Sequence, residues 1–482
     1  MRLGQTSVIY FISKIVGSVL GFFATVYFAR ELGETVLGQY ALVLALVTWL
    51  GIGGKLGFSS AITKRISEGE EPRKFLGAGM VVMSVMISVT AVLVAIFRDQ
   101  VNAYVGVPVA EFVVFLLFVS LYKSLINASL KGNHLVHVYA VLSSGKQALR
   151  AVSQIALVVV GFGLAGMLWG YAIGYAVTAT IGLLILGLRP AIPKKRHVVS
   201  LFDYAKFAWL GSMRSKTFDS VDIAVLGVFV TQGLVGIYSV AWSLSKFLDI
   251  FGSAISSTLF PEMSKVSAED GVDAVSGLTE DALAYAGLIL TPGLVGGLVL
   301  GDRLMAIYGD SFVPGTEVLP ILILSLLVYT YNKQLLNTLN AIDRPDLAFR
   351  SNAVFVVANV MLNAILIWQL GWVGAAIATA VSAAVGLLFA FHYASTHVPF
   401  STPFGEIARQ WSAAIVMGLV VYVAREVGEA NLAWVDDLNA VFVVALVGLG
   451  ATVYFAILFG ISAEFRTTVA NNLPFDVPLI NP

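Results

Sequence analysis

The sequence predicts an all-α protein whose helices cross a lipid bilayer many times. Of the 482 residues, 58% are hydrophobic and only 12% are charged, and the mean hydropathy is +0.88. Soluble domains carry about a quarter charged residues, so this composition is typical of an integral membrane protein. Apolar stretches of about 20 residues, the length of a spanning helix, recur from one end of the chain to the other.

Hydropathy divides the chain into about fourteen candidate spans joined by short polar connectors. They cover about residues 6–28, 37–60, 76–97, 111–131, 145–162, 164–188, 203–229, 233–260, 281–301, 315–340, 351–370, 372–392, 406–425 and 438–460. The first span follows Met1 and Arg2 without a small-residue cleavage site, so we expect it to be retained. No stretch remains that is long enough for a separate soluble domain.

Lysine and arginine are concentrated in every second connector, which predicts an orientation. With the N-terminus inside, the inner connectors include the basic run at 194–196, and three more bases are assigned between the fourth and fifth spans. The outer connectors hold only Arg30, Arg98, Arg303 and Arg425. Because basic loops stay in the cytoplasm, we expect both termini inside the cell, in a multi-pass protein of the plasma membrane.

The second half of the sequence repeats features of the first. The matched pairs are LGQY (37–40) with VGIY (235–238), GLAG (163–166) with GWVG (371–374), and Asn127 with Asn337. We therefore predict two six-helix lobes, residues 1–198 and 199–400, followed by two extra helices in 401–482. Because six is an even number, the lobes share one orientation and a pseudo-two-fold axis along the membrane normal, with the substrate site between them.

The seventh predicted span, residues 203–229, carries four charges at its centre: Arg214, Lys216, Asp219 and Asp222. A charge at the middle of a bilayer costs on the order of 2.5–3.5 kcal/mol, so this half of the helix must face protein or water. We interpret it as one wall of a hydrated cavity. The alternative is that the four residues form ion pairs that only hold helices together.

Basic residues outnumber acidic residues within the predicted spans. The bases are Lys14, Lys55, Lys123, Arg214, Lys216, Lys246 and Lys333, and the acids are Asp219, Asp222 and Asp249. Because an unpaired phosphate is costly to bury, this excess of positive charge suits an anionic ligand. Lys55 and Lys333 are weaker candidates, since a lysine near the end of a span also reaches the interface for purely structural reasons.

Other kinds of site find no support in the sequence. The chain has no cysteine, and its five histidines lie in predicted connectors or at helix ends without a carboxylate cluster, so we expect no metal. No Walker motif or glycine-rich nucleotide loop occurs, so we expect no cofactor and no transport driven by ATP bound to this chain. A formal net charge of +0 gives no reason to expect nucleic acid as a partner.

The opening residues 13–40, SKIVGSVLGFFATVYFARELGETVLGQY, resemble the start of a known family. It is that of the polysaccharide-biosynthesis flippases, the Wzx-like branch of the multidrug/oligosaccharidyl-lipid/polysaccharide exporter superfamily. GLVGIYSVAWSLSKFL (233–248) and ISSTLFPEMSK (255–265) resemble it in the second half.

The resemblance implies that a polyprenyl-linked oligosaccharide bearing phosphate or pyrophosphate is moved from the inner to the outer leaflet by alternating access. It also implies that basic residues in the cavity between the lobes bind the lipid phosphate. Lys14, Arg214, Lys216 and Lys246 are the positions that we match to this role. Membrane lipids are expected partners. Asp219, Asp222 or Asp249 would either pair with these basic residues or couple transport to Na⁺ or H⁺.

Two other functions stay open. A MATE-like exporter of drugs or small molecules would more naturally carry an excess of intramembrane acids that bind cations. A membrane glycan polymerase or transferase would present carboxylates or arginines on a large outer loop, and the outer connectors here are short. We therefore predict a transporter rather than an enzyme, acting as a monomer.

Overall fold

A computed structural model describes residues 3–55 and 57–472 of the chain. Within these ranges, the side chains at 3–16, 18, 53–55, 206–217, 219, 469, 471 and 472 lie outside the description. The elements of the described ranges are α-helices and two 3₁₀ helices, and no strand occurs among them. This confirms the predicted all-α class.

The chain forms two compact units, Met1–Ser239 and Val240–Pro482. The helices that begin in the first unit are α1 (Leu3–Lys55), α2 (Phe58–Ser67), α3 (Pro72–Ile96), α4 (Arg98–Val105), α5 (Ala110–Gly132), α6 (Val136–Val159), α7 (Gly163–Leu186), α8 (Lys195–Phe229) and α9 (Gln232–Leu248). The predicted division into residues 1–198, 199–400 and 401–482 rests on the sequence repeat, whereas the two units are defined by contacts within the fold. The three-part division therefore stays a prediction.

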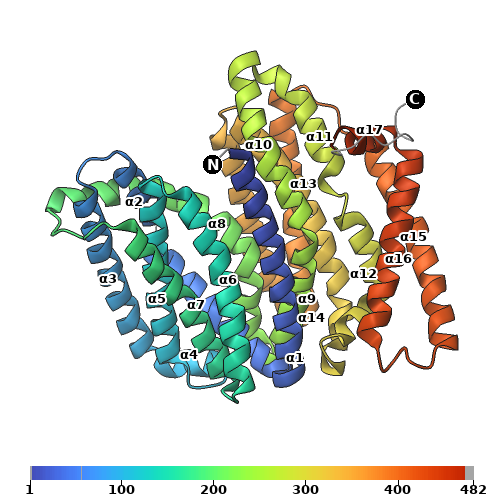
Figure 1. Cartoon of the computed structure of the whole chain (residues 1–482), viewed down its shortest axis with the longest axis horizontal. Helices are drawn as coiled ribbons and strands as arrows, with labels where there is room; N and C mark the ends of the chain where they lie inside the picture. Colours follow the sequence, from blue (N-terminus) through green and yellow to red (C-terminus); the bar gives the residue numbers. More distant parts are fainter. Residues whose placement is uncertain (1–2, 56, 473–482) are drawn as a thin grey trace. The chain divides into compact units, whose positions relative to one another are not determined.

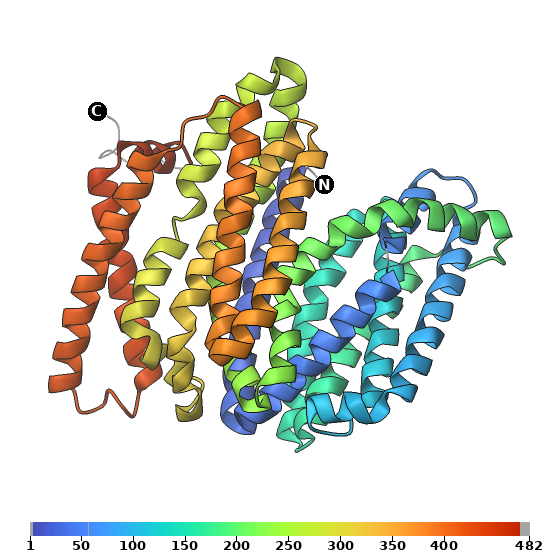
Figure 2. The same ribbon diagram turned by 180° about the vertical axis from the view of Figure 1, so that it is seen from behind.

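Helix α5 is at the centre of the first unit. It packs against α2, α3 and α7, and α6 packs along α7, as Figures 1 and 2 show. Leu117, Leu121 and Ile126 of α5 are fully buried in a core that also contains Phe58 and Ile62 of α2. A lysine on the buried face of α5 is therefore held inside the protein and cannot reach the lipid headgroups.

Glycines bring α7 close to α6. A Cβ atom on Gly170 would lie 2.6 Å from the backbone nitrogen of Gln154, and one on Gly174 would lie 3.0 Å from the backbone nitrogen of Arg150. Only a residue without a side chain permits this approach, which is a common device of membrane helix pairs. The close contact places the polar face of α6 directly beside the tyrosines of α7.

The second unit contains the remaining helices. They are α10 (Ile250–Asp270), η1 (Val272–Val275), α11 (Ser276–Ala286), α12 (Leu290–Ala306), η2 (Asp310–Glu317), α13 (Leu319–Ala341), α14 (Pro345–His397), α15 (Phe404–Asn431), α16 (Asn439–Ile461) and α17 (Ala463–Asn472). α13 packs along α14, and α15 and α16 pack together against α12. Arg425 of α15 donates to Asp302 of α12 at 2.6 Å and to Glu429 at 2.7 Å, which fastens α15 to α12 at one end.

Two helices, α1 and α14, are 53 residues long. At 1.5 Å per residue each would extend about 80 Å, more than twice the roughly 30 Å hydrocarbon core. Each is broken at a glycine with positive φ, Gly33 (φ 76°) and Gly371 (φ 60°), which other residues rarely adopt. Each is therefore long enough for two crossings, and each break falls where the sequence predicts a connector between two spans.

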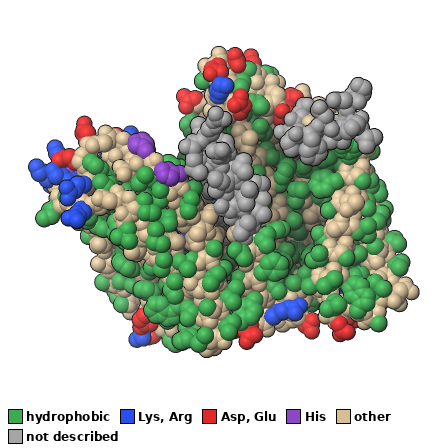
Figure 3. Space-filling view, in the orientation of Figure 1, with side chains coloured by type: hydrophobic (Ala, Val, Ile, Leu, Met, Phe, Trp, Pro, Cys, Tyr) green, Lys and Arg blue, Asp and Glu red, His purple; other side chains and the backbone are tan. Residues whose placement is uncertain are grey.

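By length and composition, nine helices of the described chain could cross a membrane, or ten if α9 and α10, bent by 46°, form one span. Counting α1 and α14 twice raises this number. α6 does not qualify, and of α8 only the shorter apolar stretch Ser220–Phe229 was considered. Figure 3 shows hydrophobic side chains over the flanks of the helices and charged side chains mainly at their ends. The protein is thus a multi-pass membrane protein, and the exact number of fourteen spans stays a prediction.

Candidate functional site

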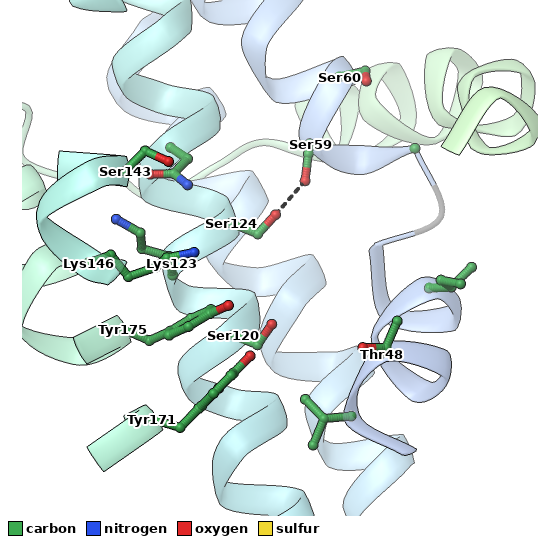
Figure 4. Close-up of a pocket in the computed structure, with 14 residues that line it drawn as sticks. Thr48, Ser59, Ser60, Ser120, Lys123, Ser124, Ser143, Lys146, Tyr171 and Tyr175 are labelled. Atoms are coloured by element: carbon green, nitrogen blue, oxygen red, sulfur yellow. Dashed lines mark hydrogen bonds between the residues drawn. The ribbon is translucent and has the colours of Figure 1, made fainter. Parts of the chain in front are cut away.

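A polar cavity of about 330 Å³ lies within the first unit, lined by residues of α1, α2, α5, α6 and α7 (Figure 4). Its lining contains two lysines, five serines, a threonine, an asparagine and two tyrosines. No aspartate or glutamate lies among the residues that line it in the described part of the chain. Among its described lining residues, the cavity therefore carries positive charge without a carboxylate to balance it.

Lys123 projects from the buried face of α5 and is only 4% exposed. Its Nζ atom has no hydrogen-bond partner among the residues that the structure describes. A buried ammonium group without partners is costly, and buried charges in proteins are normally paired. Lys123 is the feature of the cavity that most needs a chemical explanation.

Lys146 projects from α6 into the same cavity. Its Nζ atom lies 4.7 Å from the ring centroid of Tyr175, a cation–π contact. Tyr175 stacks on Tyr171 with ring centroids 4.1 Å apart and an interplanar angle of 18°. Figure 4 shows the two lysines and the two tyrosines on one side of the cavity, with both tyrosine hydroxyls directed inward.

Hydroxyl groups from α2 and α5 form the other side of the cavity. The Oγ atoms of Ser59 and Ser124 lie 2.8 Å apart and share one hydrogen bond. Thr63, one turn beyond Ser59, donates to the carbonyl of Ala128 at 3.1 Å, which holds α2 against α5. Because a serine hydroxyl both donates and accepts, this wall has donors to offer an incoming ligand.

Arg150 and Gln154 of α6 contact tyrosines beside the cavity. Arg150 Nη2 donates to the hydroxyl of Tyr40 at 2.7 Å, and Gln154 Nε2 donates to the same hydroxyl at 2.8 Å. The Arg150 guanidinium also lies 5.1 Å from the ring centroid of Tyr171. α6 therefore carries a further positive charge beside the cavity, that of Arg150. This charge contacts a tyrosine hydroxyl and a tyrosine ring.

Five of the residues predicted from the sequence have side chains outside the described part of the structure. They are Lys14, Lys55, Arg214, Lys216 and Asp219. Asp222, in the same predicted span, is 6% exposed and accepts a hydrogen bond of 2.7 Å from the hydroxyl of Tyr238. The predicted convergence of these charges on a cavity between two lobes stays a prediction.

Two other predicted residues, Asp249 and Lys333, lie close together in the second unit. Asp249 is at the bend between α9 and α10, where Thr330 donates to its Oδ1 at 3.0 Å and Ser253 donates to its Oδ2 at 2.8 Å. Lys333 Nζ donates to the same Ser253 hydroxyl at 3.0 Å. The ammonium group of Lys246 lies 5.6 Å from the centroid of the Trp242 ring.

The cavity contains residues that the sequence prediction did not choose. Lys123 is counted among the intramembrane bases but is not selected as a site residue, and Lys146 and Arg150 fall among the bases assigned to a connector. The structure places both within α6. Lys146, Arg150 and Gln154 are spaced four apart, so they share one face of a helix, and this spacing is the signal that would have found them.

Comparisons with known proteins agree on one family. The family model described as "Polysaccharide biosynthesis protein" matches residues 3–267. The chain is 28% identical to a protein named "Probable low-salt glycan biosynthesis flippase Agl15" from Haloferax volcanii, over 99% of this chain and 100% of that protein.

Solved structures share the fold. "Lipid II flippase MurJ, inward closed conformation" aligns with a TM-score of 0.79 at 16% identity, covering 96% of this chain and 100% of that one. An inward-facing multidrug resistance MATE family transporter aligns with a TM-score of 0.63 at 14% identity, covering 79% of this chain and 95% of that one. At these identities the likeness concerns the fold alone.

Proposed function

Because the chain belongs to the polysaccharide biosynthesis protein family, we propose that it flips a lipid-linked oligosaccharide from the cytoplasmic to the outer leaflet of the plasma membrane. The observation that carries the proposal is the similarity to a glycan biosynthesis flippase over 99% of this chain. The similarity therefore extends over both units of this chain. The lipid carrier in this proposal is a polyprenyl phosphate or pyrophosphate.

Physical chemistry explains what such a protein must supply. A sugar chain and a phosphate cannot cross about 30 Å of hydrocarbon unaided, because their hydrogen bonds to water would be lost without replacement. Lysines and arginines at membrane depth offer charge-assisted hydrogen bonds to the phosphate during passage. In this proposal Lys14, Arg214, Lys216 and Lys246 do so from a cavity between the halves, with Lys55 and Lys333 in secondary roles.

The proposed protein makes and breaks no covalent bond, and both of its termini are cytoplasmic. Alternating access moves the substrate, and the acids Asp219, Asp222 and Asp249 are left for ion coupling or charge pairing. Export of an organic cation is less well supported, because the cavity of the first unit contains two lysines and no acid among its described lining residues. A functional monomer remains part of the proposal.

The proposal is tested by reconstituting the full chain into liposomes with a fluorescent polyprenyl-pyrophosphate oligosaccharide in both leaflets. A membrane-impermeant quencher then measures how fast the inner-leaflet lipid appears outside. We expect rapid loss of all fluorescence with the wild-type protein and loss of only the outer half in protein-free liposomes.

The Arg214→Ala/Lys216→Ala double variant should insert normally and slow the flipping rate at least tenfold, because the phosphate loses two cations. Lys265→Ala, an exposed lysine on α10, is the matched control. Wild-type kinetics that equal those of protein-free liposomes would refute the proposed function.

A further inference from the structure

The lysine cavity of the first unit has a composition that the flipping function alone does not explain. It is enclosed within one helical unit, and its two cations are unbalanced in its described lining. We propose that this cavity binds an oxyanion, that is, a group with carboxylate, sulfate or phosphate chemistry. The inference rests on the proposed function only for the source of the anion: an acidic group of the transported glycan, or a free inorganic oxyanion.

The first argument is the state of Lys123. The residue is only 4% exposed, and its Nζ atom has no hydrogen-bond partner in the described part of the chain. A lysine near the end of a span can extend its ammonium group to water, but this one lies on the buried face of α5. In its charged form this lysine has no partner among the described residues, and an anion that enters the cavity would supply one.

The second argument is the identity of its neighbours. Lys146 brings a second ammonium group into the same cavity, and Figure 4 shows the two lysines beside one another. Two like charges that share one cavity repel one another. An anion between them turns this repulsion into two attractions, whereas a cation or a neutral ligand would leave it in place.

The third argument is the supply of neutral hydrogen-bonding groups. Ser59, Ser60, Ser120 and Ser124 present hydroxyls to the cavity, and Asn127 adds an amide whose Oδ1 is buried without a partner. An oxyanion has several lone pairs, which two ammonium groups and several hydroxyls can satisfy together. A volume of about 330 Å³ lies at the lower end of the range of ligand pockets, about 300–1,000 Å³, so the cavity has room for more than a single water.

The experiment measures binding by titration calorimetry on the purified full-length protein in detergent. The probes are inorganic phosphate, glucuronate and glucose. We expect phosphate or glucuronate to bind the wild type and glucose not to bind. Affinity should fall at least tenfold in Lys123→Gln and in Lys146→Gln, and it should be unchanged in Lys131→Gln, an exposed lysine at the end of α5 that does not line the cavity.

The probes also separate the two sources of the anion. Tighter binding of glucuronate than of phosphate assigns the cavity to an acidic sugar of the glycan, and the reverse order assigns it to a free inorganic oxyanion. Binding of neither probe, or equal binding by Lys123→Gln and Lys131→Gln, overturns the inference. If Lys123→Gln does not fold, Lys146→Gln carries the same test.

The liposome assay keeps this inference separate from the proposed function. Flipping of the lipid-linked oligosaccharide without any anion binding by the purified protein would refute the cavity assignment and leave the flippase proposal intact. Anion binding that depends on Lys123, together with no flipping, would refute the flippase proposal and leave the anion site intact.

Discussion

Two lysines at matching positions of the sequence repeat have opposite surroundings. Lys123 in α5 lies four residues before Asn127, and Lys333 in α13 lies four residues before the matching Asn337. Lys333 donates to Ser253, which in turn donates to Asp249, so the second unit provides a carboxylate within two hydrogen bonds. Lys123 has no such chain in the described structure and shares its cavity with Lys146.

This difference shows how matching positions in two repeated halves of one chain can take different roles. Where a cation has an acid nearby, its charge has a partner within the fold even when no ligand is bound. Where the acid is missing, the same cation remains available to an anion from outside. The comparison therefore predicts different responses to mutation in the two units.

The largest effect is expected where the cavity wall depends on a glycine. Gly170→Ala would place a Cβ atom 2.6 Å from the backbone nitrogen of Gln154, so α6 and α7 must separate. We expect a loss of about 3 kcal/mol in the free energy of unfolding. Gly145→Ala on α6 is the control, because its Cβ atom would meet nothing within 4 Å. Thermal unfolding in detergent measures both, and equal melting temperatures would show that α6 and α7 are not closely packed.

A smaller effect is expected from the acid of the second unit. Asp249→Asn removes the negative charge that accepts hydrogen bonds from Thr330 and Ser253 and that lies near Lys333. Hydrogen bonds to charged groups contribute about 1.5–3 kcal/mol when buried, and this site is partly exposed, so we expect a loss of about 1–2 kcal/mol. Asp273→Asn, an exposed acid in η1, should leave the melting temperature unchanged. An unaffected Asp249→Asn variant would mean that Lys333 does not depend on this carboxylate.

The smallest effect concerns an acid at the edge of the first unit, outside the spans. Glu71 pairs with Lys74, with His197 at 2.7 Å and with Arg196 at 2.5 Å. Hydrogen bonds from Lys74 and then from His197 lower the pKa of Glu71 from 4.5 to about 2. Because the pKa in the folded state is below its ordinary value, these pairs stabilise the fold above pH 4.5. The contribution is lost as the pH falls from about 4.5 to about 2.

The measurement is the difference in unfolding free energy between wild type and Glu71→Gln as a function of pH. We expect a difference at pH 7 that disappears toward pH 2 and that shrinks in high salt, because the group is exposed. Glu68→Gln, whose partner Arg65 lies three residues earlier in the chain, is the matched control. A difference that is constant across this pH range would exclude the ion pairs as its cause.

The sequence was sufficient to predict the fold class and the kind of function. Spanning helices follow from apolar length, and the breaks at Gly33 and Gly371 fall where the hydropathy pattern predicts connectors. These properties are local, so a window of about 20 residues contains the information. The family likeness at the start of the chain is equally local.

The candidate cavity was harder to predict because pairing is not local. Lys333 is 80 residues from Ser253, and Thr330 is 81 residues from Asp249, so only the fold reveals which base has an acid beside it. The count of bases also misplaced Lys146 and Arg150, because it assigned them to a connector although the predicted fifth span, 145–162, contains both. In the structure their charges face α7 and α1 rather than lipid.

The most direct test compares the two matching lysines in one melting experiment on the full chain. Phosphate or glucuronate should raise the melting temperature of the wild type and of Lys333→Gln, and should leave Lys123→Gln unchanged, because bound ligand stabilises only a protein that has the site. Without ligand, Lys333→Gln should melt below Lys123→Gln, since it removes the cation that donates to Ser253 beside Asp249. Equal melting temperatures and equal ligand responses in the two variants would contradict the division of roles between the units.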